Sequence, residues 1–247
     1  MAVQMRYLGW TAFELVTEQG TRVLLDPMLA GRPQDGVPPG PVSMEELERV
    51  DLVLITHAAA DHVGQAFAIL QRFPQARLVC DVATRYRAME EAGIPDERIY
   101  RMVSGVQFVF GEVTVKALAA QHLSLARMPT GFLSAQPLSY LLTIEGRERI
   151  FFGGDTSLHG DLRLYGELYQ PHVAMLGVGG VDVHGQSLTE LPPEEAALVA
   201  KWLGVRVAIP MHYRFQEGEE FIAALHREAP QVKGLLLQPG ERFTFHL

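Results

Sequence analysis

Five apolar runs in this chain are each followed, within three residues, by a histidine or an aspartate. The runs are short, rich in Val, Leu, Ile and Phe, and bounded by Gly, Pro or Asp, which predicts buried β-strands. The polar residues that follow them are Asp26, His57, His122, Asp155 and His212. We therefore expect a fold in which strand ends bring these side chains to one edge of a sheet.

The predicted strands form two strand-rich halves, each completed by helices. Strands are predicted at residues 5–9, 13–17, 22–26, 52–56 and 77–80, and then at 106–110, 112–119, 138–144, 149–152, 173–176, 205–209, 234–237 and 242–246. Helices are predicted at residues 81–92, 192–203 and 218–228, together with a short helix through Arg49 that Ser43 and Glu46 would open as a capping box. The first three strands predict an antiparallel meander. This order predicts an α/β (α+β) fold of two sheets packed face to face with helices outside.

Length and composition favour one compact domain. With 247 residues and 48% hydrophobic content, the chain can bury one large core, so we expect a single domain over residues 1–247. The formal net charge of −8 and the scattered basic residues argue against binding to nucleic acid. No apolar stretch approaches the roughly 20 residues that cross a bilayer, and the first residues lack the features of a signal peptide. The lone Cys80 cannot form an intrachain disulfide, so we expect a cytoplasmic protein.

The residue types at the strand ends suit a metal ion. Imidazoles and carboxylates without a thiolate are ligands for Zn²⁺, Mn²⁺ or Fe²⁺ and are typical of catalytic rather than structural sites. Asp61 and His62 add a further carboxylate and imidazole to the loop that begins at His57. Considered alone, Asp61 would more simply cap the following helix, but the same placement after other strands favours metal binding. Asp26 is expected to hold the His57 loop by hydrogen bonds.

Six short motifs carry a resemblance to a known family. They are YLGWTAF at residues 7–13, LLDP at 24–27, THAAADH at 56–62, AAQHLS at 119–124, GGDTSLHGD at 153–161 and IPMHY at 209–213. Through these motifs the chain resembles the metallo-β-lactamase superfamily over nearly its whole length, and within it the lactonase-like branch of small cytoplasmic hydrolases. The resemblance implies a four-layer αββα sandwich with a metal site along one edge.

The resemblance also implies two metal positions. One would use His57, residue 59 and His122, and the other Asp61, His62 and His212, with Asp155 bridging. This chain departs from the family pattern at Ala59, where the family has a histidine, and at Trp10, where the branch usually has a histidine. Both departures are expected to remove a polar group near the site.

Charge counting favours one tightly bound ion. Asp61 and Asp155 together neutralise one divalent ion held by His62 and His212. A second ion would have only His57 and His122 as its own ligands, so we expect a mononuclear site. Weaker occupancy of the second position stays open.

Two further histidines are candidates to replace the missing ligand. His184 lies in a glycine-rich loop that can approach closely, and His159 follows Asp155 in the same motif. His184 is the better candidate of the two. The alternative is that each is a surface imidazole or a contact to substrate.

The ligand set predicts a metal-dependent hydrolase. A bound ion lowers the pKa of its water toward about 7 and polarises the bond under attack. Asp61 would orient the water or carry its proton, and His57 or His122 would act as general acid if not bound to metal. Lactone, ester and phosphodiester bonds are all compatible with this chemistry.

Two other interpretations remain open at this point. In the first, the chain is a catalytically degenerate member of the same fold that binds a metal ion or a ligand without turnover. In the second, its histidines are structural and bind no metal. For the hydrolase we expect a small-molecule substrate and no nucleic-acid or membrane partner, while homo-oligomerisation is left open. An anionic substrate would suit side chains close in sequence to the site, namely Arg127, Tyr140, Tyr213 and Arg214.

Overall fold

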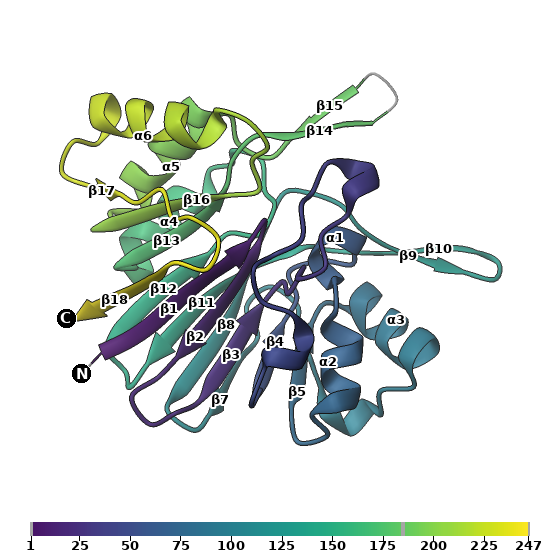
Figure 1. Cartoon of the computed structure of the whole chain (residues 1–247). Helices are drawn as coiled ribbons and strands as arrows, with labels where there is room; N and C mark the ends of the chain where they lie inside the picture. The colour runs from purple at the N-terminus through teal and green to yellow at the C-terminus, as the bar shows by residue number, and fades with distance from the viewer. Residues whose placement is uncertain (1, 184–185, 247) are drawn as a thin grey trace. The chain divides into compact units, whose positions relative to one another are not determined.

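The computed structural model describes residues 2–183 and 186–246, which form two compact units (Figure 1). The first unit contains the residues up to Val106, Leu123–Leu138 and the residues from Leu237. The second contains Gln107–His122 and Ser139–Leu236. Both units have one large sheet and helices, so the mixed α/β class expected from the sequence is confirmed. The prediction of a single domain over residues 1–247 stays a prediction.

The sheet of the first unit has seven strands in the order β18-β1-β2-β3-β4-β5-β6. Their bounds are β1 Ala2–Gly9, β2 Ala12–Val16, β3 Arg22–Leu25, β4 Leu52–Leu54, β5 Arg77–Cys80, β6 Ile99–Arg101 and β18 Arg242–His246. β18, β1, β2 and β3 pair antiparallel, which confirms the predicted meander, and β3 to β6 pair parallel. β4 lies between two parallel strands with all its residues buried, as its continuous apolar run predicts.

Three helices and a hairpin complete the first unit. They are α1 Ala60–Val63, α2 Ala66–Arg72, α3 Val82–Ala92, and the hairpin of β9 Ser124–Met128 with β10 Gly131–Ala135. α2 packs on the sheet through Ile69 and Leu70, which share a core with Val53 and Leu78. α3 begins at Val82 because the carboxylate of Asp81 accepts the backbone N–H groups of Ala83 and Thr84.

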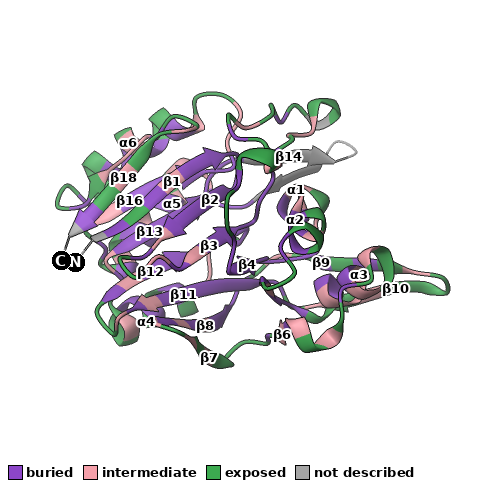
Figure 2. Ribbon diagram, turned by 60° about the horizontal axis from the view of Figure 1, so that its bottom comes forward, coloured by how far each residue is buried: buried purple, intermediate pink, exposed green. Residues whose placement is uncertain are grey.

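The sheet of the second unit also has seven strands, in the order β17-β16-β13-β12-β11-β8-β7. Their bounds are β7 Gln107–Phe110, β8 Val113–Ala119, β11 Leu138–Ile144, β12 Glu148–Phe152, β13 Val173–Gly177, β16 Val207–Met211 and β17 Lys233–Gly234. β12, β13, β16 and β17 pair parallel. The helices α4 Asp161–Tyr169, α5 Pro193–Leu203 and α6 Glu217–Glu228 pack on this sheet, and the hairpin of β14 Gly180–Val183 with β15 Gln186–Thr189 precedes α5. β13 is buried along its whole length, whereas β7 alternates between exposed and intermediate residues (Figure 2).

Most predicted strands are present, and two local predictions are wrong. The helix expected to reach Arg49 is a three-residue 3₁₀ turn, η2 (Met44–Glu46), because Leu47 is already extended and buried. The strand expected at 234–237 pairs over only two residues of β17. The other 3₁₀ turns are η1 Pro33–Asp35 and η3 Asp96–Arg98. Among the residues that the structure describes, none of the helices has the length and apolarity to cross a bilayer.

Candidate metal centre

The loop after β4 carries three of the predicted ligands within the first unit. His57 and His62 are buried, and Asp61 is partly buried. α1 begins at Ala60, and the carbonyl of Ala59 accepts the backbone N–H groups of His62 and Val63. Ala59 is therefore the residue that precedes the helix, with no side-chain cap. The alternative in which Asp61 caps this helix is wrong, because Asp61 lies inside it.

Asp26 supports His62 from β3. Its Oδ2 lies 2.7 Å from Nδ1 of His62, and the same carboxylate accepts the amide of Thr56 at 2.8 Å and its hydroxyl at 2.7 Å. The hydrogen bonds expected between Asp26 and this loop are thus present. Burial raises the pKa of Asp26, and the contacts with His62 and Thr56 act in the opposite direction. With a proton on Nδ1, Nε2 of His62 is the nitrogen left free to accept a metal ion, and that atom lies 3.8 Å from Oδ2 of Asp61.

Trp10 contributes a polar contact that the sequence interpretation missed. Its indole N–H donates to Oδ2 of Asp61 at 3.1 Å. The expectation that Trp10 removes a polar group near the site is therefore wrong. Compared with the histidine that the resemblance implies at this position, a tryptophan lacks a nitrogen acceptor but keeps an N–H donor.

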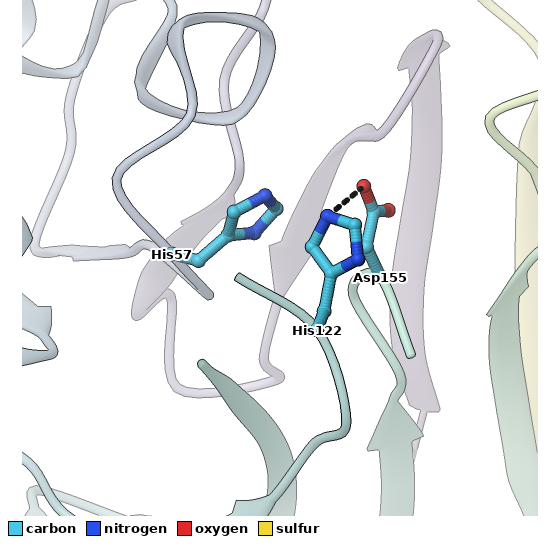
Figure 3. A group of neighbouring side chains, drawn as sticks. All are labelled: His57, His122 and Asp155. Atoms are coloured by element: carbon cyan, nitrogen blue, oxygen red, sulfur yellow. Dashed lines mark ion pairs between the residues drawn. The ribbon is translucent and has the colours of Figure 1, made fainter. Parts of the chain in front are cut away.

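The second unit brings together the other three predicted ligands. His122 follows β8, Asp155 follows β12 and His212 follows β16. Figure 3 draws the contact between His122 and Asp155 as a dashed line. Oδ2 of Asp155 lies 3.8 Å from Nε2 of His122 and 3.5 Å from Nε2 of His212. One carboxylate oxygen therefore faces both imidazoles, which is the arrangement expected of a bridging ligand.

Glu190 is a buried carboxylate that sequence reasoning did not find. Its Oε2 lies 3.6 Å from Nδ1 of His212, on the opposite side of the ring from Asp155. Asp155, Glu190 and His212 form one group whose ligand atoms lie within 4.8 Å of one another. Glu190 had no distinctive signal, because it precedes an acid-rich helix start in which exposed glutamates are usual.

The remaining candidates lie in varied surroundings. The ring nitrogens of His159 are buried and form no hydrogen bond with any residue that the structure describes, and burial lowers the pKa of the ring. Burial also raises the pKa of Tyr213. Tyr140 is fully buried in β11, whereas Arg127 is exposed on β9. His184 lies outside the described residues, so its proposed role as a replacement ligand stays a prediction.

Within each unit, the donor set fits a divalent metal ion. The donors are imidazole nitrogens and carboxylate oxygens, and the carboxylates of Asp26 and Glu190 lie beside two of the imidazoles. Because such donors lie about 2 Å from a zinc ion, two donors of one ion lie within about 4 Å of each other. The separations of 3.8 Å between His62 and Asp61 and of 3.5 Å between His212 and Asp155 meet this condition.

Comparison with known proteins finds that this chain is similar to one group of proteins. A family model described as a beta-lactamase superfamily domain matches residues 21–213. A metal-dependent hydrolase of Aeropyrum pernix is 33% identical over 98% of this chain and 97% of its own. A metal-dependent hydrolase of Cupriavidus taiwanensis is 34% identical over 98% of this chain and 86% of its own. The structure of Igni18, a metallo hydrolase from Ignicoccus hospitalis, has a TM-score of 0.81 at 26% identity and covers 100% of both chains. The fold class predicted from the sequence is confirmed.

Proposed function

The chain belongs to the metallo-β-lactamase superfamily of metal-dependent hydrolases, and from that premise we propose that both ligand sets serve one hydrolytic centre. The proposed metal ligands are His57, Asp61, His62, His122, Asp155 and His212. The observation that carries the proposal is the position of Asp155, whose Oδ2 faces the Nε2 atoms of two histidines from different strands. On this proposal the two units act together as one domain.

A divalent ion at this centre would lower the pKa of a bound water toward about 7 and polarise the bond under attack. The protein's own part is to place and orient groups around that water. Asp26 fixes the ring of His62 through Nδ1, and Glu190 faces Nδ1 of His212. Asp61 orients the attacking water and accepts its proton, and His57 or His122 donates a proton to the leaving group when not bound to metal.

We propose that one ion is held tightly and that the second position is weak. The donors of the tight position are His62 and His212 with the carboxylates of Asp61 and Asp155, whose two negative charges neutralise one divalent ion. The other position lacks a ligand, because Ala59 presents only a methyl group at the start of α1. Loss of a direct ligand should weaken binding by more than the roughly 10- to 100-fold typical of losing a supporting residue.

The proposed substrate is a small molecule with a lactone, ester or phosphodiester bond. All three bonds are cleaved by attack of an activated water, and all three develop negative charge on oxygen that a cation stabilises. Zinc and manganese are the proposed ions, with ferrous iron compatible, because the donors are nitrogen and oxygen atoms only.

The test combines metal analysis with a panel of substrates. Wild type, His62→Ala and His226→Ala are dialysed against zinc and then assayed on a generic lactone, an aryl ester and a bis-aryl phosphate. His226 is exposed on α6, so its variant is the matched control. We expect wild type and His226→Ala to retain one ion per chain and hydrolyse at least one substrate, and His62→Ala to lose both properties.

The alternative of a binding protein without turnover has its own expected result. If wild type retains metal but hydrolyses none of the panel, while Ala59→His takes up a second ion and gains activity, the missing ligand has abolished catalysis. That outcome would replace the hydrolase proposal with a metal- or ligand-binding function. The change adds an imidazole at a partly exposed position, so it leaves the buried core intact.

A further inference from the structure

We propose that Trp10 is a positioning residue of the metal centre, whose indole N–H holds the carboxylate of Asp61 so that Asp61 and His62 bind the same ion. The inference rests on the proposed function, because it assigns Trp10 a role toward the same metal. It also gives a specific meaning to the residue that stands where related chains are expected to have a histidine.

The contacts around Asp61 carry the inference. Nε1 of Trp10 lies 3.1 Å from Oδ2 of Asp61, and the same oxygen lies 3.8 Å from Nε2 of His62. The side chain of Asp61 is 25% exposed. Trp10 is only 7% exposed, so the donor is held more firmly than the acceptor. The indole therefore limits the rotamers of a carboxylate that already faces a ligand histidine.

The backbone of the β1–β2 turn fixes Trp10 itself. Trp10 has φ +52°, a left-handed conformation that costs energy for a large aromatic residue. Its carbonyl accepts the hydroxyl of Tyr7 at 3.0 Å, and its ring packs with Met28 and Val37. Such strain persists where the surrounding structure imposes it, and it is concentrated at functional sites. Among the other described non-glycine residues, Asp26, Glu145, Gln170 and His212 also have positive φ; of these, His212 is a proposed ligand and Asp26 contacts the proposed ligand His62.

The chemistry of the indole ring allows Trp10 to orient a metal ligand but not to be one. An indole has one N–H donor and no acceptor, so Trp10 orients a carboxylate but cannot bind a metal ion. A hydrogen bond from a neutral donor to a carboxylate is charge-assisted and stronger than a bond between neutral groups. The ordinary alternative is that Trp10 only fills space between Met28 and Val37. The substitution Trp10→Phe distinguishes positioning from space filling, because Phe fills much of the same space but has no N–H donor.

The first experiment observes the hydrogen bond directly in otherwise unmodified protein. The chain contains two tryptophans, Trp10 and Trp202, so the ¹⁵N–¹H spectrum has two indole signals, which Trp202→Phe assigns. We expect the Trp10 signal to shift on addition of zinc and in Asp61→Asn, and the Trp202 signal to stay unchanged. If the Trp10 signal responds to neither, the inference is overturned.

The second experiment measures zinc affinity, independently of turnover. We expect Trp10→Phe to bind zinc roughly 10- to 100-fold more weakly, as for loss of a group that orients a ligand, and Trp202→Phe to bind as wild type does. Equal affinity in Trp10→Phe and wild type would refute the positioning role even if wild type hydrolyses substrates. Conversely, wild type that binds zinc but hydrolyses nothing would refute the proposed function, while the affinity of Trp10→Phe would still decide the role of Trp10.

Discussion

Oδ2 of Asp26 and Nδ1 of His62 lie 2.7 Å apart in an interior where both side chains are fully buried. The second unit has a counterpart, since Oε2 of Glu190 lies 3.6 Å from Nδ1 of His212. In each case the opposite ring nitrogen faces an aspartate of the ligand set. Each unit thus places a buried carboxylate beside one of the histidines proposed as ligands. In the first unit the hydrogen bond to Asp26 orients the ring of His62 and raises the basicity of the nitrogen proposed to bind the metal.

Asp26→Asn should weaken metal binding roughly 10- to 100-fold, because the amide is a poorer acceptor for Nδ1–H of His62 than the carboxylate is. Isothermal titration with zinc measures the change. Asp51→Asn is the matched control, because Asp51 is also buried but accepts hydrogen bonds from Arg22 and Arg49 at the start of β4. Equal affinities for zinc in the two variants would contradict the role assigned to Asp26.

Glu190→Gln should also weaken metal binding, by about 10-fold, the lower end of the same range because 3.6 Å is longer than a hydrogen bond. Competition with a chromophoric chelator measures the affinity. Glu148→Gln is the control, because Glu148 is equally buried at 2% exposure and lies at the start of β12. A larger loss of metal affinity in Glu148→Gln than in Glu190→Gln would show that removing a buried charge, and not the contact with His212, lowers the affinity.

Ser124→Ala should destabilise the fold by about 1–3 kcal/mol, because the N–H of Ala58 loses its acceptor and the buried carboxylate of Asp81 loses one of its hydrogen-bond donors. The hydroxyl donates to Asp81 at 2.8 Å and accepts the N–H of Ala58, next to His57, at 3.0 Å. Urea unfolding measures the loss. Ser139→Ala, whose buried hydroxyl donates only to the carbonyl of Gly153, should cost less, about 1 kcal/mol. A larger loss of stability in Ser139→Ala than in Ser124→Ala would contradict the role assigned to the two hydrogen bonds of Ser124.

Stability should fall as the pH drops below 6.5, in part because of His172. Burial, aided by Arg149 and Arg206, lowers the pKa of His172 from 6.5. The unfolded chain therefore binds more protons between the lowered pKa and 6.5, so the stability that neutral His172 contributes is present above this window and lost below it. Urea midpoints across the window measure the slope.

The variant His172→Asn should flatten this pH dependence. An asparagine keeps an acceptor for the backbone N–H of Arg149, which Nδ1 of His172 accepts at 3.1 Å, but does not titrate. Part of the slope should remain, because burial also lowers the pKa of His159. His226→Asn, on the exposed side of α6, is expected to keep the wild-type slope. An unchanged slope in His172→Asn would exclude His172 as its source.

Strands bounded by clear turns were predicted well, because burial on both faces imposes a continuous apolar pattern. Residues 77–80 and 138–144 coincide with β5 and β11. The strand predicted at 205–209 is displaced to Val207–Met211, because Val205 is buried in the helix-covered core outside the strand. The hairpin of β9 and β10 was missed, since its largely exposed residues carry no such apolar run.

The sequence by itself determined which residues follow buried strands, because alternation, apolar runs and turn residues act over a few neighbouring positions. That was enough to nominate His57, Asp61, His62, His122, Asp155 and His212. Only the tertiary structure decided which side chains support them: Trp10 reaches Asp61 across 51 positions and Asp26 reaches His62 across 36. Such pairs depend on how the strands are ordered and oriented in space. A local pattern of hydrophobicity contains no information about which distant residues this arrangement brings into contact.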